Sequence, residues 1–557
     1  MVTITKLHAR AYNHLNDFQK EIFDECIAKG SGGLSLPKGS GKTFLSTVVA
    51  LYQTEKPILV VCAKSLIPNW KAQLEEHFDG KLKYELAYSG ENRNLKTWKL
   101  DPETRVVITT PDHLANVYKS RDLREHLIDQ VFMNQLTYTN VYSKPSSPPL
   151  HIDMGVESLF SRVWGCLIID ESQNHCKISS QKAQALCTIL ADHTWLTSGD
   201  LIPTSHAEKI FGYYLLLDEQ CPRNLPDFKR WIRGQYIPGL DLFLGLATTT
   251  VHRDKNEAFH GVTLLKKIVT HSMSQEERSI YTAFQEIIRC LNEKIKALKA
   301  ADVHGEELKS VSSYILAMIS YLRQSLVSPV LPLANLALKW MDSKNRDDFS
   351  KMIQEELEKL DLYSWLNTED CVMSSRFKKV LELLALHDEK VVIFTSYRTS
   401  ISLMQHFLGQ EDREIFTLES SMSSKKRGIV LQEFEDSDNG ILLLTYSIGG
   451  EGLNLQFARI CILVDYEWSG HITDQAICRV FRMGQQHKEV LAYFMTSGTG
   501  IESSILQRQF QQQQIVKELF MGVVKSSVKS VKLADMIKMV LAENNQEWLQ
   551  KVYAIEV

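Results

Sequence analysis

The stretch LSLPKGSGKTFLSTVVALY, residues 34–52, decides the fold class, because it joins a short apolar strand to an apolar helix through a glycine-rich turn. The turn and the first helical positions hold Gly39, Ser40, Gly41, Lys42 and Thr43. Glycines let backbone N–H groups turn toward an anion, and a helix N-terminus adds positive potential. The order strand, turn, helix therefore predicts a phosphate-binding loop, in which Lys42 would reach the β and γ phosphates of a nucleotide and Thr43 would offer its hydroxyl to Mg²⁺.

The strict form of that loop has glycine where this chain has Leu36, so a purely structural glycine-rich turn is the alternative. The segment CLIIDESQ, residues 166–173, favours the phosphate-binding interpretation, because it is an apolar strand that ends in an acidic pair. At a strand tip, Asp170 would hold the water shell of Mg²⁺ and Glu171 would orient and deprotonate an attacking water. Taken alone, such an acidic pair is more often part of a solvated loop.

Gln19 lies ahead of the phosphate-loop segment, in the stretch LNDFQKEIFD. Its amide is able to bond the edge of an adenine, and the alternative is an ordinary surface glutamine. Gln19 is therefore a candidate for nucleotide binding.

A second stretch with candidate nucleotide-binding and catalytic residues follows much later in the chain. LLLTYSIGGEGLNLQ, residues 442–456, is an apolar strand followed by a glycine-rich loop, and Gly450, Gly452 and the later Gln485 are further candidates for nucleotide binding. In DQAICRVFRMGQ, residues 474–485, Arg479 and Arg482 are three residues apart and so share one face of a helix. Forked guanidiniums suit the developing charge on a γ-phosphate, although an arginine pair is usually a solvated, salt-bridged face.

Short apolar strands alternate with helix-patterned stretches in both blocks, which predicts an α/β protein with two parallel sheets. The segment from Ser274 to Trp365 has helical spacing instead, and the stretch from Lys119 to Val163 is irregular. We expect a first lobe over residues 1–270, a helical insertion over 271–370, a second lobe over 371–520 and a helical tail over 521–557. The predicted strands are 33–36, 57–62, 105–109, 166–169, 193–197, 390–394, 413–418, 440–445, 460–464 and 490–495.

The composition sets limits on this interpretation. A chain of 557 residues is longer than a single hydrophobic core usually organises, so we expect two or more domains. Its net charge of -4 gives no overall attraction to a polyanion, so binding of nucleic acid would need a local basic track. The ten cysteines form no C-x-x-C pair, which argues against structural zinc and a disulfide framework and favours a reducing compartment, nucleus or cytoplasm. No apolar leader or run of eighteen apolar residues is present, so we expect no membrane association.

The order of the motifs resembles superfamily-two helicases, and specifically the Swi/Snf family of chromatin remodellers and DNA translocases. The resemblance spans roughly residues 14–510. It is carried by LNDFQKEIFD (15–24), PKGSGKT (37–43), ILVVCAKSLIPNW (58–70), VVITTPD (106–112), IIDESQNHCK (168–177, with Lys177 as the trailing lysine), LTSG (196–199), VHRDK (251–255), YLRQSLVSPVL (321–331), KVVIFTSY (390–397), DYEW (465–468) and QAICRVFRMGQ (475–485).

This resemblance implies two RecA-like lobes that use ATP and Mg²⁺, with Lys42, Thr43, Asp170 and Glu171 in the first lobe and arginine fingers at Arg479 and Arg482. It also implies double-stranded DNA held by its phosphates, without reading of sequence. The candidate nucleic-acid contacts are Lys64, Ser65, Thr109 and Thr110 in the first lobe, and Ser396, Tyr446, Ser447, Asn454 and Trp468 in the second. The implied protein is a monomeric motor, of a compact kind that a virus could encode, acting with DNA-bound, transcription or replication proteins.

Two alternatives stay open at this stage. A strand-separating helicase would use most of the same motifs. An ATP-binding DNA scaffold with weakened coupling is favoured only by LTSGD, residues 196–200, which lacks the usual form of the motif that links hydrolysis to movement.

Overall fold

The computed structural model divides the chain into two compact units, which we call lobe one (residues 1–260 and 512–530) and lobe two (residues 261–511 and 531–557). The residues that the structure describes are 6–37, 39–88, 100–118, 159–160, 162–176, 180–199, 201, 207–217, 250–252, 261–302, 305–341, 355, 372–409, 412–449, 453–482, 484–520 and 533–542. Within these residues, no helix is both long and apolar enough to cross a membrane.

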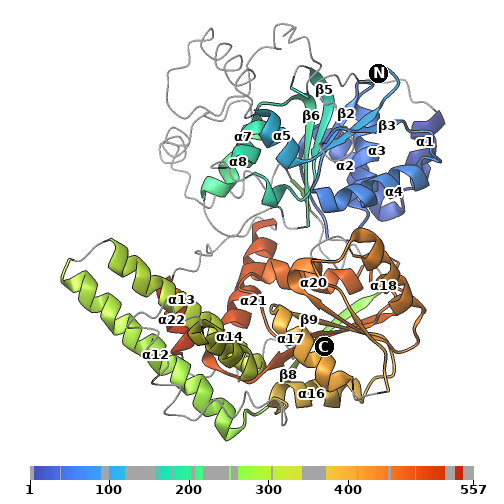
Figure 1. The fold of residues 1–557 in the computed structure, drawn as a ribbon. Coiled ribbons are helices and arrows are strands. Elements are labelled where there is room, and N and C mark those ends of the chain that lie inside the picture. The colour runs from blue at the N-terminus through green and yellow to red at the C-terminus, as the bar shows by residue number, and fades with distance from the viewer. Residues whose placement is uncertain are drawn as a thin grey trace. The chain divides into compact units, whose positions relative to one another are not determined.

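Lobe one is built on a parallel sheet of seven strands in the order β3-β4-β2-β5-β6-β1-β7 (Figure 1). Its elements are α1 (Lys6–Asn13), α2 (Asp17–Lys29), β1 (Gly32–Ser35), α3 (Lys42–Gln53), β2 (Ile58–Val61), η1 (Lys64–Leu66), α4 (Ile67–His77), β3 (Tyr84–Leu86), β4 (Val106–Thr109), α5 (Pro111–Tyr118), β5 (Val163–Ile169), η3 (Ser172–Asn174), α7 (Gln181–Cys187), β6 (Leu190–Ser198), α8 (Ala207–Leu217) and β7 (Thr250–His252).

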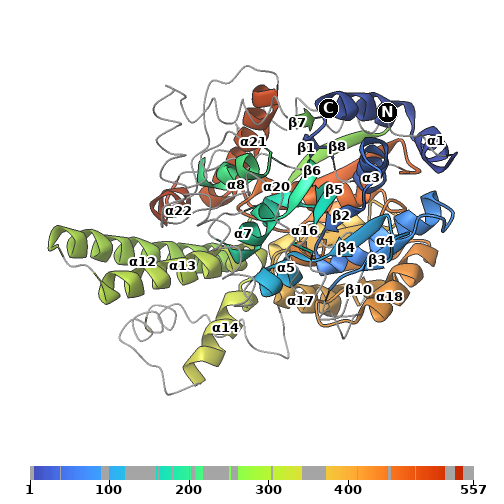
Figure 2. The ribbon, with the colours of Figure 1, turned by 90° about the horizontal axis from the view of Figure 1, so that it is seen from above.

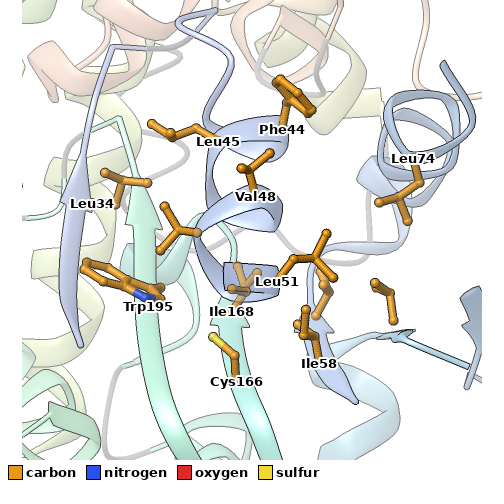
Figure 3. Close-up of a cluster of buried hydrophobic side chains, with 14 of the residues drawn as sticks. Leu34, Phe44, Leu45, Val48, Leu51, Ile58, Leu74, Cys166, Ile168 and Trp195 are labelled. Atoms are coloured by element: carbon orange, nitrogen blue, oxygen red, sulfur yellow. The ribbon is translucent and has the colours of Figure 1, made fainter. Parts of the chain in front are cut away.

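Helices cover both faces of this sheet, which explains why its central strands are apolar throughout rather than alternating. On one face, α2, α3 and α4 pack against β1, β2 and β5, and the apolar residues of α3 lie over Trp195, Cys166 and Ile168 (Figure 3). On the other face, α5, α7 and α8 form a second buried cluster. Because all strands are parallel, their carboxyl ends meet at one edge of the sheet, where ligands of open α/β sheets bind.

Lobe two is built on a parallel sheet of six strands in the order β10-β11-β9-β12-β13-β8. Its elements are β8 (Thr263–Thr270), α12 (Gln275–Ala300), α13 (Glu306–Val327), α14 (Val330–Met341), α16 (Ser375–Leu384), β9 (Val391–Thr395), α17 (Arg398–Leu408), β10 (Ile415–Thr417), α18 (Ser424–Asp436), β11 (Ile441–Thr445), α19 (Tyr446–Gly449), β12 (Ile460–Leu463), α20 (Gly470–Val480), β13 (Glu489–Thr496), α21 (Gly500–Phe520, whose residues from 512 onward are assigned to lobe one) and α22 (Leu533–Val540).

The long helices α12 and α13 lie side by side as a hairpin within lobe two (Figures 1 and 2). A capping box starts α12, since Ser274 Oγ accepts from the N–H of Glu277 (3.1 Å) and the Glu277 carboxylate accepts from the N–H of Ser274 (2.8 Å). Helix α22 packs on this hairpin, and Gln285 Nε2 donates to the carbonyl of Val540 (2.7 Å). The described part of the segment expected to be a separate helical tail therefore belongs to lobe two.

The structure places the first boundary ten residues before the expected one at residue 270. β8 pairs with β13 over eight residues, Thr263 to Thr270, so this strand is part of the second sheet. Each of the ten predicted strands has its counterpart in the structure, whereas β3, β7 and β8 were not predicted. Lys119 to Ser158, which includes the sequence KPSSPP, and residues 342–354 and 356–371 lie outside the described residues.

Candidate nucleotide and nucleic-acid sites

The phosphate-loop segment leaves β1 at Ser35 and enters α3 at Lys42, as the sequence predicts. Gly39 (φ 86°) and Gly41 (φ 77°) both lie in the left-handed region that glycine adopts without strain. A Cβ on Gly41 would lie 2.4 Å from Nε2 of Gln19, so this position also lacks room for a side chain. No side chain caps the N-terminus of α3 in the described chain, which leaves its first N–H groups directed at the loop.

Lys42 is nearly buried, with 8% of its surface exposed, and its ammonium lies inside the loop. Nζ donates to the carbonyls of Leu36 (2.9 Å) and Pro37 (3.0 Å). Ser40 Oγ donates to the carbonyl of Pro37 (2.8 Å), which tightens the same turn. Leu36, the departure from the strict pattern, thus contributes its backbone oxygen to hold the lysine.

Gln19 supports the loop from the neighbouring helix α2. Its Oε1 accepts from the N–H of Asn16 (3.2 Å), which completes a capping box, and its Nε2 donates to the carbonyl of Ser40 (3.2 Å). The alternative of an ordinary surface residue is wrong, because Gln19 is 5% exposed. Adenine binding by this amide stays a prediction.

Asp170 follows β5, and three donors hold its carboxylate at the same sheet edge. Oδ2 accepts from Trp70 Nε1 (2.9 Å), and Oδ1 accepts from Thr197 Oγ1 (2.9 Å) and from the N–H of Glu171 (3.0 Å). Burial and then the Glu171 carboxylate raise the pKa of Asp170, while the donors and the Lys42 ammonium act in the opposite direction. The acidic pair is therefore not part of a solvated loop.

Glu171 adopts a left-handed backbone conformation (φ 47°, ψ 46°), which is uncommon for a residue other than glycine. Its carboxylate accepts from Gln173 Nε2 (2.5 Å), and Gln173 Oε1 accepts from Ser198 Oγ (2.6 Å). Thr197 of the LTSG motif thus bonds directly to Asp170, and Ser198 is connected to Glu171 through Gln173. This is a connected polar arrangement on a backbone position of the strained kind found at functional sites.

The described residues contain no cluster of three or more His, Cys, Asp and Glu side chains that would hold a metal by themselves. Mg²⁺ usually takes one or two protein oxygens and keeps water and phosphate as its other ligands. The carboxylate of Asp170 and the half-buried hydroxyl of Thr43 are oxygens of that kind. The donor set fits Mg²⁺ held together with a nucleotide.

In lobe two, the helix α20 carries Arg479, and Arg482 follows its end. Arg479 Nε donates to the carbonyl of Gly449, and Arg482 Nη1 donates to that of Leu453 (3.2 Å). Burial and the nearby Arg479 lower the pKa of Arg482 to about 10, so both guanidiniums remain cationic at neutral pH and repel each other. Arg482 Nε is buried without a hydrogen-bond partner among the described residues. This pair is therefore not the solvated, salt-bridged face of the alternative interpretation.

Gln485, a candidate for nucleotide binding, is engaged in the backbone of lobe two. Its Nε2 donates to the carbonyls of Ala458 (3.0 Å) and Val480 (2.9 Å), and its Oε1 accepts from the N–H of His487 (3.1 Å). The structure gives it the role of holding the turn that follows Arg482. Gly450, Gly452 and the trailing Lys177 lie outside the described residues, as does the RDK part of VHRDK at 253–255.

The candidate nucleic-acid contacts of lobe one follow β2 and β4 at the same edge as the phosphate loop. Lys64 and Ser65 are exposed on η1, and the Lys64 ammonium lies 5.9 Å from the centre of the Tyr88 ring. Thr109 is buried and donates to the carbonyl of Ala87 (2.6 Å). Thr110 is buried and its hydroxyl accepts from the N–H of His113 (3.1 Å) at the start of α5. The structure differs from the expectation for both threonines, because β4 ends inside the core.

In lobe two, Ser447 and Asn454 are exposed, and Ser396 and Trp468 are partly exposed. The guanidinium carbon of Arg323 lies 4.9 Å from the centre of the Trp468 ring.

Tyr446 differs from the expectation of a DNA contact. It is 3% exposed, stacks on Phe394 and donates its hydroxyl to the carbonyl of Asp465 (2.6 Å), so it is a core residue.

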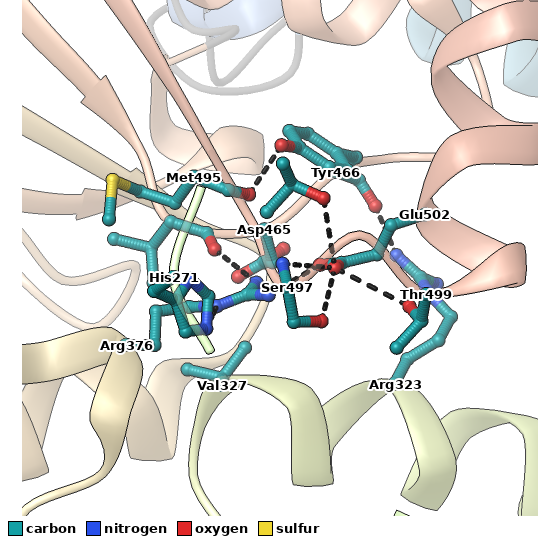
Figure 4. A network of polar contacts seen from close by, with 12 residues as sticks. His271, Arg323, Val327, Arg376, Asp465, Tyr466, Met495, Ser497, Thr499 and Glu502 are labelled. Carbon is teal, nitrogen blue, oxygen red and sulfur yellow. Dashed lines mark hydrogen bonds and ion pairs between the residues drawn. The ribbon is translucent and has the colours of Figure 1, made fainter. Parts of the chain in front are cut away.

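Asp465 is a residue that the sequence reasoning did not single out. Its carboxylate accepts from Thr395 Oγ1 (2.5 Å) and from the N–H of Ser396 (2.9 Å). Figure 4 shows an adjacent polar network, which centres on Glu502 and in which the buried Arg376 bonds Glu502 (2.6 Å). Trp70 was likewise missed as a partner of Asp170, although its presence at the end of ILVVCAKSLIPNW was noted. No local sequence signal pairs residues so far apart.

Two family models match this chain. The SNF2-related domain matches residues 37–331, which is more than half of the chain, and the helicase conserved C-terminal domain matches residues 375–484. The chain belongs to the SNF2-related family. This confirms the resemblance that the motif order predicts and the fold class of two RecA-like lobes.

Individual relatives agree with the family. The SNF2 domain-containing protein ENL1 of Oryza sativa subsp. japonica is 26% identical, over 90% of this chain and 51% of its own length. Protein CHROMATIN REMODELING 24 of Arabidopsis thaliana is 23% identical, over 86% of this chain and 44% of its own length. This SNF2-related chain thus spans about half the length of these two relatives. A solved SWI2/SNF2 ATPase core of Sulfolobus solfataricus in complex with dsDNA is 19% identical, covers 97% of both chains and has a TM-score of 0.36, too low to add to the assignment.

Proposed function

We propose that this SNF2-related chain is a DNA-stimulated ATPase that converts ATP to ADP and phosphate and moves along double-stranded DNA. The observation that carries the proposal is the joint geometry at the edge of the first sheet. An uncapped helix N-terminus and the buried Lys42 ammonium follow β1, and the fixed Asp170 carboxylate follows β5, at the carboxyl ends of two parallel strands that both pair with β6. Backbone donors and a cation suit the phosphates of a nucleotide, and a directed carboxylate suits its metal ion.

Each candidate residue has a distinct proposed role. Lys42 leaves the carbonyls of Leu36 and Pro37 and binds the β and γ phosphates, while the N–H groups of Gly39 to Thr43 surround them. Thr43 and Asp170 would hold Mg²⁺, which would neutralise phosphate charge. Glu171 orients the attacking water and takes its proton. Arg479 and Arg482 supply positive charge to the transition state, and their mutual repulsion favours the approach of an anion.

Duplex DNA is the proposed track. Lys64 and Ser65 in lobe one and Ser447 and Asn454 in lobe two are exposed polar residues beyond the carboxyl ends of strands, and lysine and hydroxyl groups bind phosphate without reading sequence. The names of relatives, such as the chromatin structure-remodeling complex protein SYD and the ATP-dependent DNA helicase DDM1 of Arabidopsis thaliana, favour DNA and remodelling. Nuclear location and DNA-bound partner proteins belong to the same proposal.

The altered LTSG motif had favoured an ATP-binding scaffold. Its Thr197 and Ser198 nevertheless bond to Asp170 and, through Gln173, to Glu171. The connection between this motif and the acidic pair is therefore intact, which favours a working motor over a scaffold.

The first test is ATP hydrolysis measured without nucleic acid and with duplex DNA, single-stranded DNA or RNA. We expect stimulation by duplex DNA, with displacement of a third strand from a triplex and no unwinding of the duplex. Lys42→Ala is expected to lower kcat at least about 100-fold, because it removes the cation at the transferred phosphate. The control is Lys56→Ala, which removes an exposed lysine paired with Asp192 (2.8 Å). Unchanged turnover in Lys42→Ala would refute the site, and stimulation by single strands alone would favour a helicase.

A further inference from the structure

We infer that Trp70 is a positioning residue that connects the exposed Lys64–Ser65 turn to the Asp170 carboxylate, and that stimulation of hydrolysis by DNA passes through its indole N–H. The inference rests on the proposed function, since it takes Asp170 as part of the ATPase site and the Lys64–Ser65 turn as a DNA contact. It adds a role for a residue that binds neither nucleotide nor DNA.

The connection is short and continuous in the chain. The turn η1 carries Lys64 and Ser65 on the surface, and α4 starts directly after it at Ile67. Trp70 lies in the first turn of α4 and is fully buried, at 0% exposure. The indole that donates to Asp170 Oδ2 at 2.9 Å thus lies five positions after an exposed serine at the sheet edge.

The indole is suited to transmit a displacement. A tryptophan side chain is rigid and has only two rotatable bonds, so a shift of its helix displaces the indole N–H by nearly the same distance. The backbone of η1 is joined to α4, because the N–H of Ile67, the first residue of α4, donates to the carbonyl of Lys64. A phosphate that draws η1 outward therefore changes the hydrogen bond at Oδ2.

The geometry at Asp170 gives that hydrogen bond a defined consequence. Oδ1 has two donors, Thr197 Oγ1 and the N–H of Glu171, whereas Trp70 is the donor recorded for Oδ2. The rotation of the carboxylate about its own axis is thus set by Trp70. Donors that orient a ligand side chain typically change affinity or activity about 10- to 100-fold when they are removed.

Trp195 provides a matched control in the same core cluster. It is 1% exposed, and its Nε1 donates at 2.9 Å to Gln53 Oε1, at the opposite end of α3 from Lys42. Trp70→Phe and Trp195→Phe each remove one buried indole N–H and keep an aromatic ring. The two variants are expected to lose similar thermal stability, so any difference in catalysis belongs to the partner of the indole.

The test measures the ratio of duplex-stimulated to basal ATPase activity in both variants. We expect Trp70→Phe to lower this ratio about tenfold, with a change in KM for ATP of less than about twofold, and Trp195→Phe to leave it unchanged. An equal fall of basal and stimulated rates in Trp70→Phe, or the same effect in both variants, would overturn the inference. If wild-type protein hydrolyses no ATP, or if DNA does not stimulate it, the proposed function fails instead.

A second readout does not depend on turnover or on a folded variant. The chain has nine tryptophans, and the indole N–H resonance of Trp70 is identified by its absence from the spectrum of Trp70→Phe, or by selective labelling where that variant does not fold. In nucleotide-free wild-type protein, duplex DNA is expected to shift this resonance and to leave that of Trp195 in place. An unmoved Trp70 resonance at saturating DNA contradicts the inference even if ATPase stimulation is observed.

Discussion

Asp170 in lobe one and Asp465 in lobe two occupy matching positions in two sheets of similar order. Each follows a central strand, β5 or β12, is nearly buried at 7% or 5% exposure, and bonds a threonine hydroxyl from a neighbouring strand. Burial raises the pKa of both carboxyls. Their surroundings differ, because Asp170 lies near the Lys42 ammonium and precedes Glu171, whereas Asp465 accepts from the backbone of Ser396 and precedes Tyr466.

This difference shows that a strand-end aspartate is a property of the fold, and that the groups beside it decide its use. Lobe one surrounds its aspartate with a phosphate loop and a second carboxylate. Lobe two uses its aspartate to hold the chain that follows β9, and its candidate catalytic residues are Arg479 of α20 and Arg482 just after it. Under the proposed function, the comparison places the carboxylates for the metal ion in lobe one and the arginines for the transition state in lobe two.

The largest expected effect tests the cationic half of this assignment. Arg482→Gln is expected to lower kcat about 1000-fold, because the loss falls on the transition state, and to change ATP affinity less than about threefold. Steady-state hydrolysis and binding of a fluorescent nucleotide measure the two effects. Arg459→Gln is the control, since Arg459 is a partly exposed arginine of lobe two that pairs with Glu389 (2.6 Å). Equal losses in binding and turnover would remove Arg482 from the transition state.

The next effect separates the two aspartates directly. Asp170→Asn is expected to lower kcat about 100-fold, because a neutral amide no longer holds the metal. Asp465→Asn is expected to keep most of the ATPase activity and to lower the free energy of unfolding of lobe two by about 1–3 kcal/mol, because its amide NH₂ faces donors. Hydrolysis and urea unfolding of both variants make the comparison. A similar loss of turnover in Asp465→Asn, with unchanged stability, would mean that the two positions share one role.

The smallest effect concerns the pH dependence of lobe one. Burial, with Lys182 nearby, lowers the pKa of His175 to about 4, and neither ring nitrogen has a hydrogen-bond partner among the described residues. Above pH 6.5 the ring is neutral whether folded or unfolded, so its contribution to stability is fully present, and it is lost as the pH falls toward 4. From pH 7.5 to pH 5 we expect a loss of roughly 2 kcal/mol in the free energy of unfolding.

His175→Gln is expected to reduce this loss, as measured by urea unfolding at the two pH values. Lobe two has its own buried histidine, His271, whose pKa burial and Arg376 lower to about 2, so it keeps its acid sensitivity in this variant. An identical pH dependence in wild type and His175→Gln would show that His175 titrates normally.

Local sequence order predicted the central strands, the phosphate loop and the acidic pair, because each is a contiguous pattern. The missed strands lie toward the sheet edges. β3 and β7 have three residues each, and β8 has Lys266 and Lys267 in its middle, which weakens the apolar pattern. Short or charged edge strands carry little periodicity for a sequence to reveal.

The candidate nucleic-acid residues show a second limit. Their positions after strands followed from the motifs, but whether a side chain points outward depends on how the strand enters the core. Thr109 and Tyr446 point inward, while Lys64 and Ser447 are exposed. The contact between Trp70 and Asp170 joins residues 100 positions apart and depends on the parallel pairing of β2 with β5. Such contacts follow from topology rather than from any local pattern.

The edge strand β7 has a mechanical consequence. It is the last described strand before the chain continues to β8 of lobe two, and it pairs only with β1, from Gly33↔Thr250 to Ser35↔His252, within the described residues. β1 is the strand that leads into the phosphate loop. Tension applied to β7 would thus act in shear on a pairing of only three residue pairs, and the strand that bears this load is the one that leads into the candidate phosphate loop.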